Sequence, residues 1–345
     1  MPDIQGQAGA SSIIDGAPAA ASSLPEKNGS SPHPGSPKGK DARVPKKLMP
    51  KKRVERIGGT VCGICAGIAT LLVVTLIFMV AEHGLATFVV DGISPIAFLT
   101  GTTWNPHSNG ADGAPLMGAL PMIVGSFGVT LLSCLFVLPF AVGAAIFTVE
   151  IAPTFGRKVL QPVIELLVGI PSVVFGLLGL TIIVPLVRGA FGGTGYGLLA
   201  GSVVLAVMVL PTVTSLSIDA IASVPNAYRE GSYGLGCSRW QTIWHVVLKS
   251  ALPGILTAVI LGMTRAFGEA LAVQMVVGNA ASIPTSLITP AATLTSVLTM
   301  GMGNEAMGTV YNDALWSLAL ILLVMSLVFI LIVHLIGRKG AKVNG

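Results

Sequence analysis

The sequence has few charged residues. Lys, Arg, Asp and Glu make up 10% of the 345 residues, against roughly 25% in soluble globular domains. Hydrophobic residues make up 52%. Ten of the twenty Lys and Arg lie within residues 1–56, so the remaining chain has long stretches without any charge. This shortage excludes an ordinary soluble protein and indicates an integral membrane protein.

Signs of catalysis are also lacking. No G-x-x-x-x-G-K-[ST] phosphate loop is present, so the chain is not expected to hydrolyse ATP itself. The five histidines are scattered without metal-ligand spacing. Cys62 and Cys65 form a C-x-x-C inside an apolar run, where they are interpreted as small helix residues. We therefore predict no catalytic residue, no metal site and no cofactor in this chain.

The N-terminal region is polar and basic. Residues 1–44 are rich in Ala, Ser, Gly and Pro, and six Lys and Arg lie within 46–56. Cations next to an apolar segment are typical of an orientation signal at anionic membrane lipid, and this favours lipid over nucleic acid as their partner. No apolar core with a signal-peptide cleavage site is present. We predict that 1–56 is a disordered cytoplasmic tail.

Six apolar segments of membrane-spanning length follow the tail. They are 57–81, 120–149, 159–187, 196–217, 253–278 and 312–337. Most remaining cations lie between alternate segments, so the positive-inside rule places both termini in the cytoplasm. The predicted organisation is an all-α integral membrane protein with these parts: first membrane helix 57–81, periplasmic loop 82–118, five-helix core 119–337 and cytoplasmic tail 338–345.

The predicted cytoplasmic loop 218–252 is unusual. It contains apolar residues at helical spacing, among them Trp240 and Trp244. A long amphipathic loop of this kind is typical of a docking element for a partner protein.

Two charges lie inside the fifth apolar segment. Arg265 and Glu269 are four residues apart, a spacing that predicts an ion pair on one helical face. Counted from Pro253, Arg265 lies about 18 Å along the helix, near the middle of the bilayer. The pair either fastens helices together, or Arg265 gives positive potential to an anion pathway that Glu269 tunes.

Other residues of the apolar segments are candidates for lining or packing. Thr212 and Ser215 follow Pro211 and are candidates for the substrate pathway or for bonds to their own backbone. Glu165 is interpreted as a buried structural acid near the inner interface. A small-residue face for helix packing on this chain or on a partner is formed by Gly59, Gly63 and Gly67.

Residues 230–236 resemble the coupling loop of bacterial ABC-importer permeases. The family signature is Glu-Ala-Ala, a glycine four residues later, then nine residues and Ile-x-Leu-Pro. Glu230 and Gly236 match it, Gly231 and Ser232 replace the alanines, and Leu248 lies in the tail, which lacks the proline at its usual place. More specific segments resemble phosphate-specific permeases of the PstC type: 98–106, 118–121, 165–174 and 265–270.

The resemblance implies a type I importer permease with a MetI-like core and an added N-terminal helix, in the bacterial inner membrane. It also implies a second permease subunit (PstA type), an ATPase dimer (PstB type) that uses ATP and Mg, a periplasmic phosphate-binding protein (PstS type) and a phosphate-signalling regulator. The subunits would move phosphate by alternating access, with Arg265 and Glu269 on the route. The alternatives are a permease for molybdate or sulfate, a secondary transporter, or a membrane scaffold without transport.

Overall fold

The computed structural model describes residues 51–109 and 115–343. Most of the predicted tail 1–56 therefore lies outside the described residues. The chain divides into two compact units, 1–63 and 64–345. In the first, residues 51–63 form the beginning of helix α1 (Lys51–Val89). The last residues of the predicted tail are thus helical, because Lys, Arg and Glu are good helix formers.

Within the described residues, six helical stretches are long and apolar enough to cross a membrane. They are Glu55–Val89, Leu120–Ile151, Ser172–Phe191, Leu198–Ala222, Arg239–Phe267 and Val310–Ile332. This confirms the predicted all-α class with six membrane helices and identifies a multi-pass membrane protein.

The segment between α1 and the next membrane helix contains regular structure, although 82–118 was predicted as a loop. Its elements are the end of α1, α2 (Pro95–Thr100), β1 (Trp104–Asn109) and β2 (Pro115–Met117). The two strands pair antiparallel, with Trp104 opposite Met117. Phe98 of α2 is fully buried and meets Phe88 and Trp104 edge to face. These aromatic contacts hold the hairpin against the helices.

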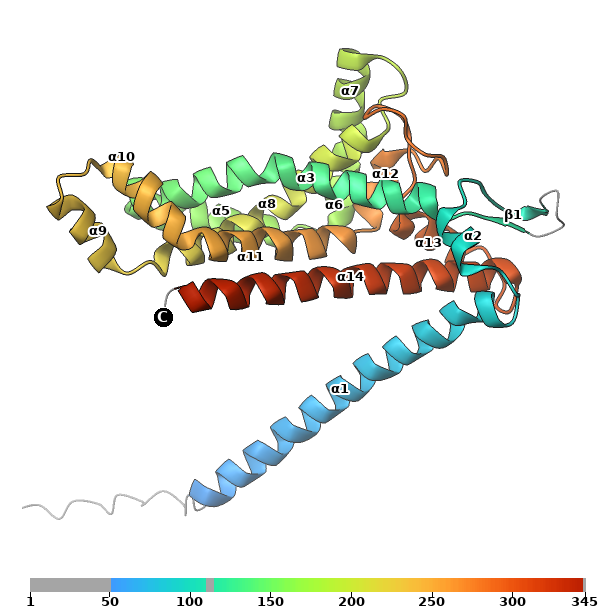
Figure 1. Ribbon diagram of the computed structural model, residues 1–345, viewed down its shortest axis with the longest axis horizontal. Helices are drawn as coiled ribbons and strands as arrows, with labels where there is room; N and C mark the ends of the chain where they lie inside the picture. Colours follow the sequence, from blue (N-terminus) through green and yellow to red (C-terminus); the bar gives the residue numbers. More distant parts are fainter. Residues whose placement is uncertain (1–50, 110–114, 344–345) are drawn as a thin grey trace, which may run out of the picture. The chain divides into compact units, whose positions relative to one another are not determined.

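The core of the second unit is a group of long helices. Its members are α3 (Leu120–Ile146), the π-helical turn η1 (Phe147–Ile151) that continues it, α8 (Leu198–Ala222), α11 (Leu248–Phe267) and α14 (Val310–Val343). Helix α8 packs on α3 and α11, and α11 packs on α14 (Figure 1). Buried Val129, Leu205 and Val213 lie at this contact. The predicted tail 338–345 begins as the helical end of α14.

The third predicted segment, 159–187, is not one helix. The stretch consists of α4 (Pro153–Phe155), η2 (Gly156–Leu160), α5 (Gln161–Gly169), α6 (Ser172–Leu178), η3 (Gly179–Ile183) and α7 (Val184–Phe191). The chain is extended at Ile170 and Pro171. A residue before proline is driven out of the helical region, so the membrane-length helix begins only at Ser172.

The fifth predicted segment, 253–278, is interrupted as well. Helix α11 ends at Phe267, and α12 (Leu271–Val277) begins after a break. A loop then leads to α13 (Leu294–Met302), whose N-terminus has a capping box of Thr293 and Ser296. This loop lies close to α3, because a Cβ at Gly125 would collide with the carbonyl oxygen of Ala292.

Three short elements fill the predicted loop 218–252. They are α9 (Asn226–Gly234), α10 (Arg239–Thr242) and η4 (Ile243–Val247), which runs directly into α11. In the second unit they lie at one end of the helix group, and the hairpin lies at the other (Figure 1). We call residues 226–247 the 226–247 segment.

Candidate functional site

The 226–247 segment has a compact helix–turn–helix form. Pro225 is extended and precedes the first residue of α9. After α9 the chain reverses at Gly236, whose φ of +82° is a conformation that favours glycine. Ser238 then caps α10, because its side chain accepts from the Gln241 N–H while the Gln241 side chain accepts from the Ser238 N–H. Local sequence signals therefore determine this form.

The segment exposes a group of large apolar side chains. Leu235 is 87% exposed, and Trp240 and Trp244 are 61% and 51% exposed. The two tryptophan rings stack with their centroids 6.0 Å apart. Tyr228 and Tyr233 are also exposed. These side chains are the apolar residues on which the prediction of a docking element rests, and their contact with a partner protein stays a prediction.

The predicted coupling residues lie in different surroundings. Glu230, Gly231 and Gly236 are exposed, and Leu248, the first residue of α11, is half-buried. Ser232 is buried, and its Oγ lies 2.9 Å from the Thr242 Oγ1. This hydrogen bond joins α9 to the end of α10. Three of the five residues are therefore accessible to a partner, and Ser232 holds the segment together.

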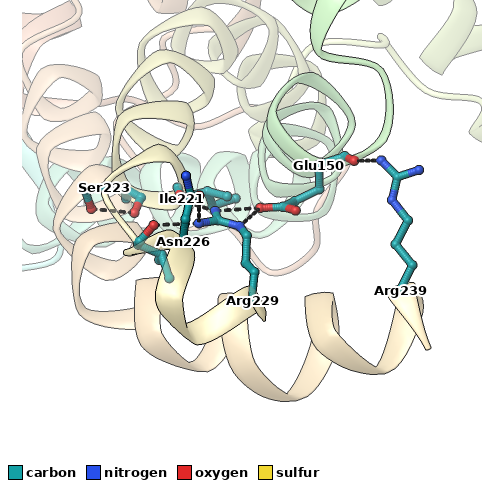
Figure 2. A network of polar contacts seen from close by, with 8 residues as sticks. Glu150, Ile221, Ser223, Asn226, Arg229 and Arg239 are labelled. Atoms are coloured by element: carbon teal, nitrogen blue, oxygen red, sulfur yellow. Dashed lines mark hydrogen bonds and ion pairs between the residues drawn. The ribbon is translucent and has the colours of Figure 1, made fainter. Parts of the chain in front are cut away.

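A buried ion pair anchors the segment to η1. Arg229 donates from Nη2 and Nε to the Glu150 Oε1 at 2.7 and 3.0 Å. The Arg229 side chain is 14% exposed and that of Glu150 is 8% exposed. Arg229 also donates to the carbonyl oxygens of Ile221 at 3.1 Å and Val224 at 2.5 Å, and to the Asn226 Oδ1 at 3.2 Å (Figure 2).

A second arginine reaches η1 from α10. Arg239 donates to the backbone carbonyl of Glu150 (Figure 2). It also donates to the carbonyl of Ile151 at 3.3 Å. The prediction did not select Glu150, although no other charged residue lies between Asp112 and Arg157. It selected Glu165 as the buried acid, and this was wrong. Glu165 is exposed on α5 and accepts from the Gln161 Nε2 at 3.2 Å.

Arg265 and Glu269 do not form the predicted ion pair in the part of the chain that the structure describes. Helix α11 ends between them, at Phe267, so their spacing of four no longer places them on one helical face. Arg265 is exposed and donates to the Thr212 Oγ1 at 2.9 Å. Glu269 turns the other way, and its Oε1 accepts from the Ala272 N–H at the start of α12 at 3.2 Å.

The predicted pathway residues of α8 lie beside Arg265. Thr212 is half-buried, and Ser215, one helical turn later, is exposed. Residues three apart lie on the same side of a helix, so Thr212 and Ser215 continue one polar face with Arg265. The structure thus joins Arg265 to Thr212, with Ser215 on the same side of α8, and gives Glu269 other partners.

Glu269 borders a small cavity with both polar and apolar lining residues. Ser126 and Thr130 of α3 line it together with Thr293 and Thr295. The cavity has room for about one water molecule. The Thr295 Oγ1 donates to the Glu269 carbonyl oxygen at 2.8 Å, and the Ser126 Oγ accepts from the Leu294 N–H at 2.9 Å. These bonds join α3 to the break between α11 and α12.

Among the described residues of each unit, the glycine face of α1 has no packing partner. A Cβ built at Gly59 or Gly63 meets no atom of the first unit within 4 Å, and one built at Gly67 meets none of the second. The sequence predicted that these glycines pack either on this chain or on a partner, and packing on a partner stays a prediction.

The sequence matches the family model described as "Binding-protein-dependent transport system inner membrane component" over residues 138–341. A Bacillus subtilis protein named a probable ABC transporter permease, YqgH, is 52% identical and is matched over 82% of this chain and 90% of the relative. The phosphate transport system permease PstC of Mesorhizobium japonicum is 34% identical over 71% of this chain and 80% of the relative.

One solved structure has a similar fold. It is a bacterial alginate ABC transporter in complex with an alginate-bound periplasmic protein, and its matching chain is 17% identical with a TM-score of 0.53. The match covers 84% of this chain and 96% of that one. At this identity the likeness concerns the fold alone.

Proposed function

The chain belongs to the family of inner membrane components of binding-protein-dependent transport systems, as a permease of the PstC type, and on that premise we propose that it carries inorganic phosphate into the cell. In this proposal it is one half of an alternating-access pore in the bacterial inner membrane, with both termini in the cytoplasm. The PstC relatives are phosphate transport permeases by name, which supports phosphate as the substrate.

The observation that carries the proposal is the polar face of Arg265, Thr212 and Ser215. Arg265 is exposed on a membrane helix and hydrogen-bonded to a neutral hydroxyl, not to a carboxylate. Its remaining N–H donors are therefore available to the oxygens of an anion. The Glu269 carboxylate accepts from the Ala272 N–H at the start of α12 and does not neutralise the charge of Arg265. A pathway for an oxyanion needs such a cation at its surface.

We assign ATP hydrolysis and its Mg²⁺ to a partner ATPase, since the sequence contains no phosphate loop. The exposed aromatic side chains of the 226–247 segment would contact this subunit, a PstB-type dimer. A PstA-type permease would complete the pore beside Arg265, and a PstS-type binding protein would dock on the 82–118 and 279–311 regions. A phosphate-signalling regulator would read the state of this assembly.

The test is radiolabelled phosphate uptake in cells that lack this gene. Wild type should restore uptake, and Glu230→Lys should abolish it by weakening ATPase docking. Arg265→Gln should lower uptake about tenfold, because a hydrogen bond to a charged group contributes about 1.5–3 kcal/mol. All variants should reach the membrane in equal amounts, as judged by immunoblot.

Two matched variants control for charge alone. Glu165→Lys changes an exposed acid outside the 226–247 segment, and Arg188→Gln changes an exposed arginine whose side chain donates to the Thr194 carbonyl. Both should transport normally. Excess sulfate or molybdate should not compete. Competition by either anion, or normal uptake without the gene, would refute the phosphate assignment.

A further inference from the structure

The cluster around Glu150 joins the 226–247 segment to two membrane helices. We propose that Glu150 is a positioning residue that transmits movement of this segment, driven by the ATPase, to α3 and α8. The proposal rests on the proposed function, because it takes the 226–247 segment as the ATPase contact. It concerns a residue that touches neither ATPase nor substrate in that scheme.

Arg229 is the first half of this link. One guanidinium group contacts the Glu150 carboxylate on η1, the Ile221 carbonyl oxygen at the end of α8 and the Val224 carbonyl oxygen just beyond it. Arg229 itself belongs to α9. A displacement of α9 therefore acts on η1 and on the end of α8 through the same side chain (Figure 2).

Arg239 is the second half of the link. It comes from α10, on the other side of the turn at Gly236, and donates to the carbonyls of Glu150 and Ile151. The last carbonyls of a helix have no partner within that helix, and η1 ends at Ile151. Arg239 supplies these carbonyls with donors, so both helices of the 226–247 segment hold the same turn.

The surroundings of Glu150 make the link stiff. Ile146, Ile221, Val224 and Ile243 pack together in one buried apolar cluster around the elements that meet here. Separating Glu150 from Arg229 would leave a buried carboxylate without a counter-ion, which is strongly unfavourable. The pair therefore stays closed, and the segment and η1 move together.

The two helices held in this way lead to the membrane site. Helix α3 continues from η1 to Ser126 and Thr130, which line the cavity beside Glu269. Helix α8 carries Thr212, which accepts from Arg265. Helix α8 therefore connects the 226–247 segment to the proposed phosphate site at Arg265 and Thr212, and α3 connects it to the cavity beside Glu269.

The experiment uses the complete transporter in proteoliposomes, with its ATPase, second permease and binding protein. Three quantities are measured: ATPase retained on the purified permease, ATP hydrolysed, and radiolabelled phosphate taken up. Glu150→Gln and Arg229→Lys should retain the ATPase and hydrolyse ATP. Phosphate taken up per ATP should fall at least about fivefold, the lower end of the range for coupling between sites.

Two variants sharpen the result. Glu150→Asp keeps the charge on a shorter side chain. Its phosphate-to-ATP ratio should lie between those of Glu150→Gln and wild type. Glu165→Gln removes an exposed acid on α5 and should match wild type. A phosphate-to-ATP ratio in Glu150→Gln equal to wild type would overturn the proposal. Loss of both Glu150→Gln and Arg229→Lys from the membrane would assign the cluster to folding and would also overturn it.

The failure of the proposed function is distinguishable from the failure of this link. If wild-type vesicles hydrolyse ATP but take up no phosphate, the substrate assignment fails. The link is then judged from the stimulation of ATP hydrolysis by the binding protein. Loss of that stimulation in Glu150→Gln supports the link, and unchanged stimulation contradicts it.

Discussion

Arg229 and Arg265 each lie near an acid, but their guanidinium groups have opposite surroundings. Arg229 is half-buried and saturated by a carboxylate 79 residues away in sequence, two carbonyls and an amide. Arg265 is exposed and bonds one threonine hydroxyl, while the acid four residues away faces another helix. A saturated arginine fastens elements together, whereas one with open donors can bind an anion. The first suits a mechanical link and the second a transport site.

The largest expected effect is a difference in the free energy of unfolding between variants of the two arginines. Arg229→Gln should lower the free energy of unfolding by roughly 3 kcal/mol, because it leaves Glu150 buried without a counter-ion. Arg265→Gln should cost clearly less, because its side chain is exposed and no carboxylate depends on it. Chemical unfolding in detergent measures both. Equal losses would show that burial does not distinguish these residues.

Double-mutant cycles give the next largest difference. Glu150 and Arg229 contact each other in the wild type. The effects of Glu150→Gln and Arg229→Gln on the free energy of unfolding should therefore depart from additivity by about 1–3 kcal/mol. Arg265→Gln and Glu269→Gln should add within about 0.5 kcal/mol, because the two side chains have separate partners. A strong departure from additivity for Arg265 and Glu269 would support the ion pair predicted from the sequence.

Two glycines of the 226–247 segment test its turn. Gly236→Ala should destabilise by roughly 1 kcal/mol, because alanine is strained at a φ of +82°. Gly231→Ala lies inside α9 with nothing within 4 Å of the new Cβ. It should be neutral or stabilise by up to about 1 kcal/mol. Thermal unfolding compares them, and a harmless Gly236→Ala would contradict a strained turn.

The smallest expected effect is a pH-dependent change in stability at Asp91. The Asp91 carboxyl has one buried oxygen without a hydrogen-bond partner among the described residues. Burial raises the pKa of Asp91 above 3.8, and the nearby Asp313 charge raises it further. A raised pKa means that ionised Asp91 disfavours folding, so wild type gains stability as pH falls through the folded pKa.

Asp91→Asn should therefore be slightly more stable than wild type at neutral pH. The difference should shrink on acidification and vanish below 3.8, where Asp91 is protonated in both states. Melting curves across this pH range measure it. Asp219→Asn, at an exposed position of α8, is the matched control. A constant advantage of Asp91→Asn at every pH would refute the electrostatic cause.

From the sequence one can predict the membrane class, the six apolar helices and the amphipathic segment near 226–247. These features follow from composition, hydrophobic periodicity and local turn residues such as Gly236 and Ser238, which act over a few positions. The resemblance of residues 230–236 and 265–270 to importer permeases likewise needs only neighbouring residues. Trp240 and Trp244 are exposed, and the docking surface predicted from them stays a prediction.

Which charges meet depends on contacts between distant segments, and these contacts could not be predicted from the sequence. The break after Phe267 separates Arg265 from Glu269, and no spacing rule for a continuous helix anticipates it. The pairing of Glu150 with Arg229 depends on how η1, α8 and α9 pack, because a buried charge takes the partner that packing brings within reach. Spacing along the chain determines neighbours on one helix, whereas the partners of buried charges are determined by contacts between distant segments.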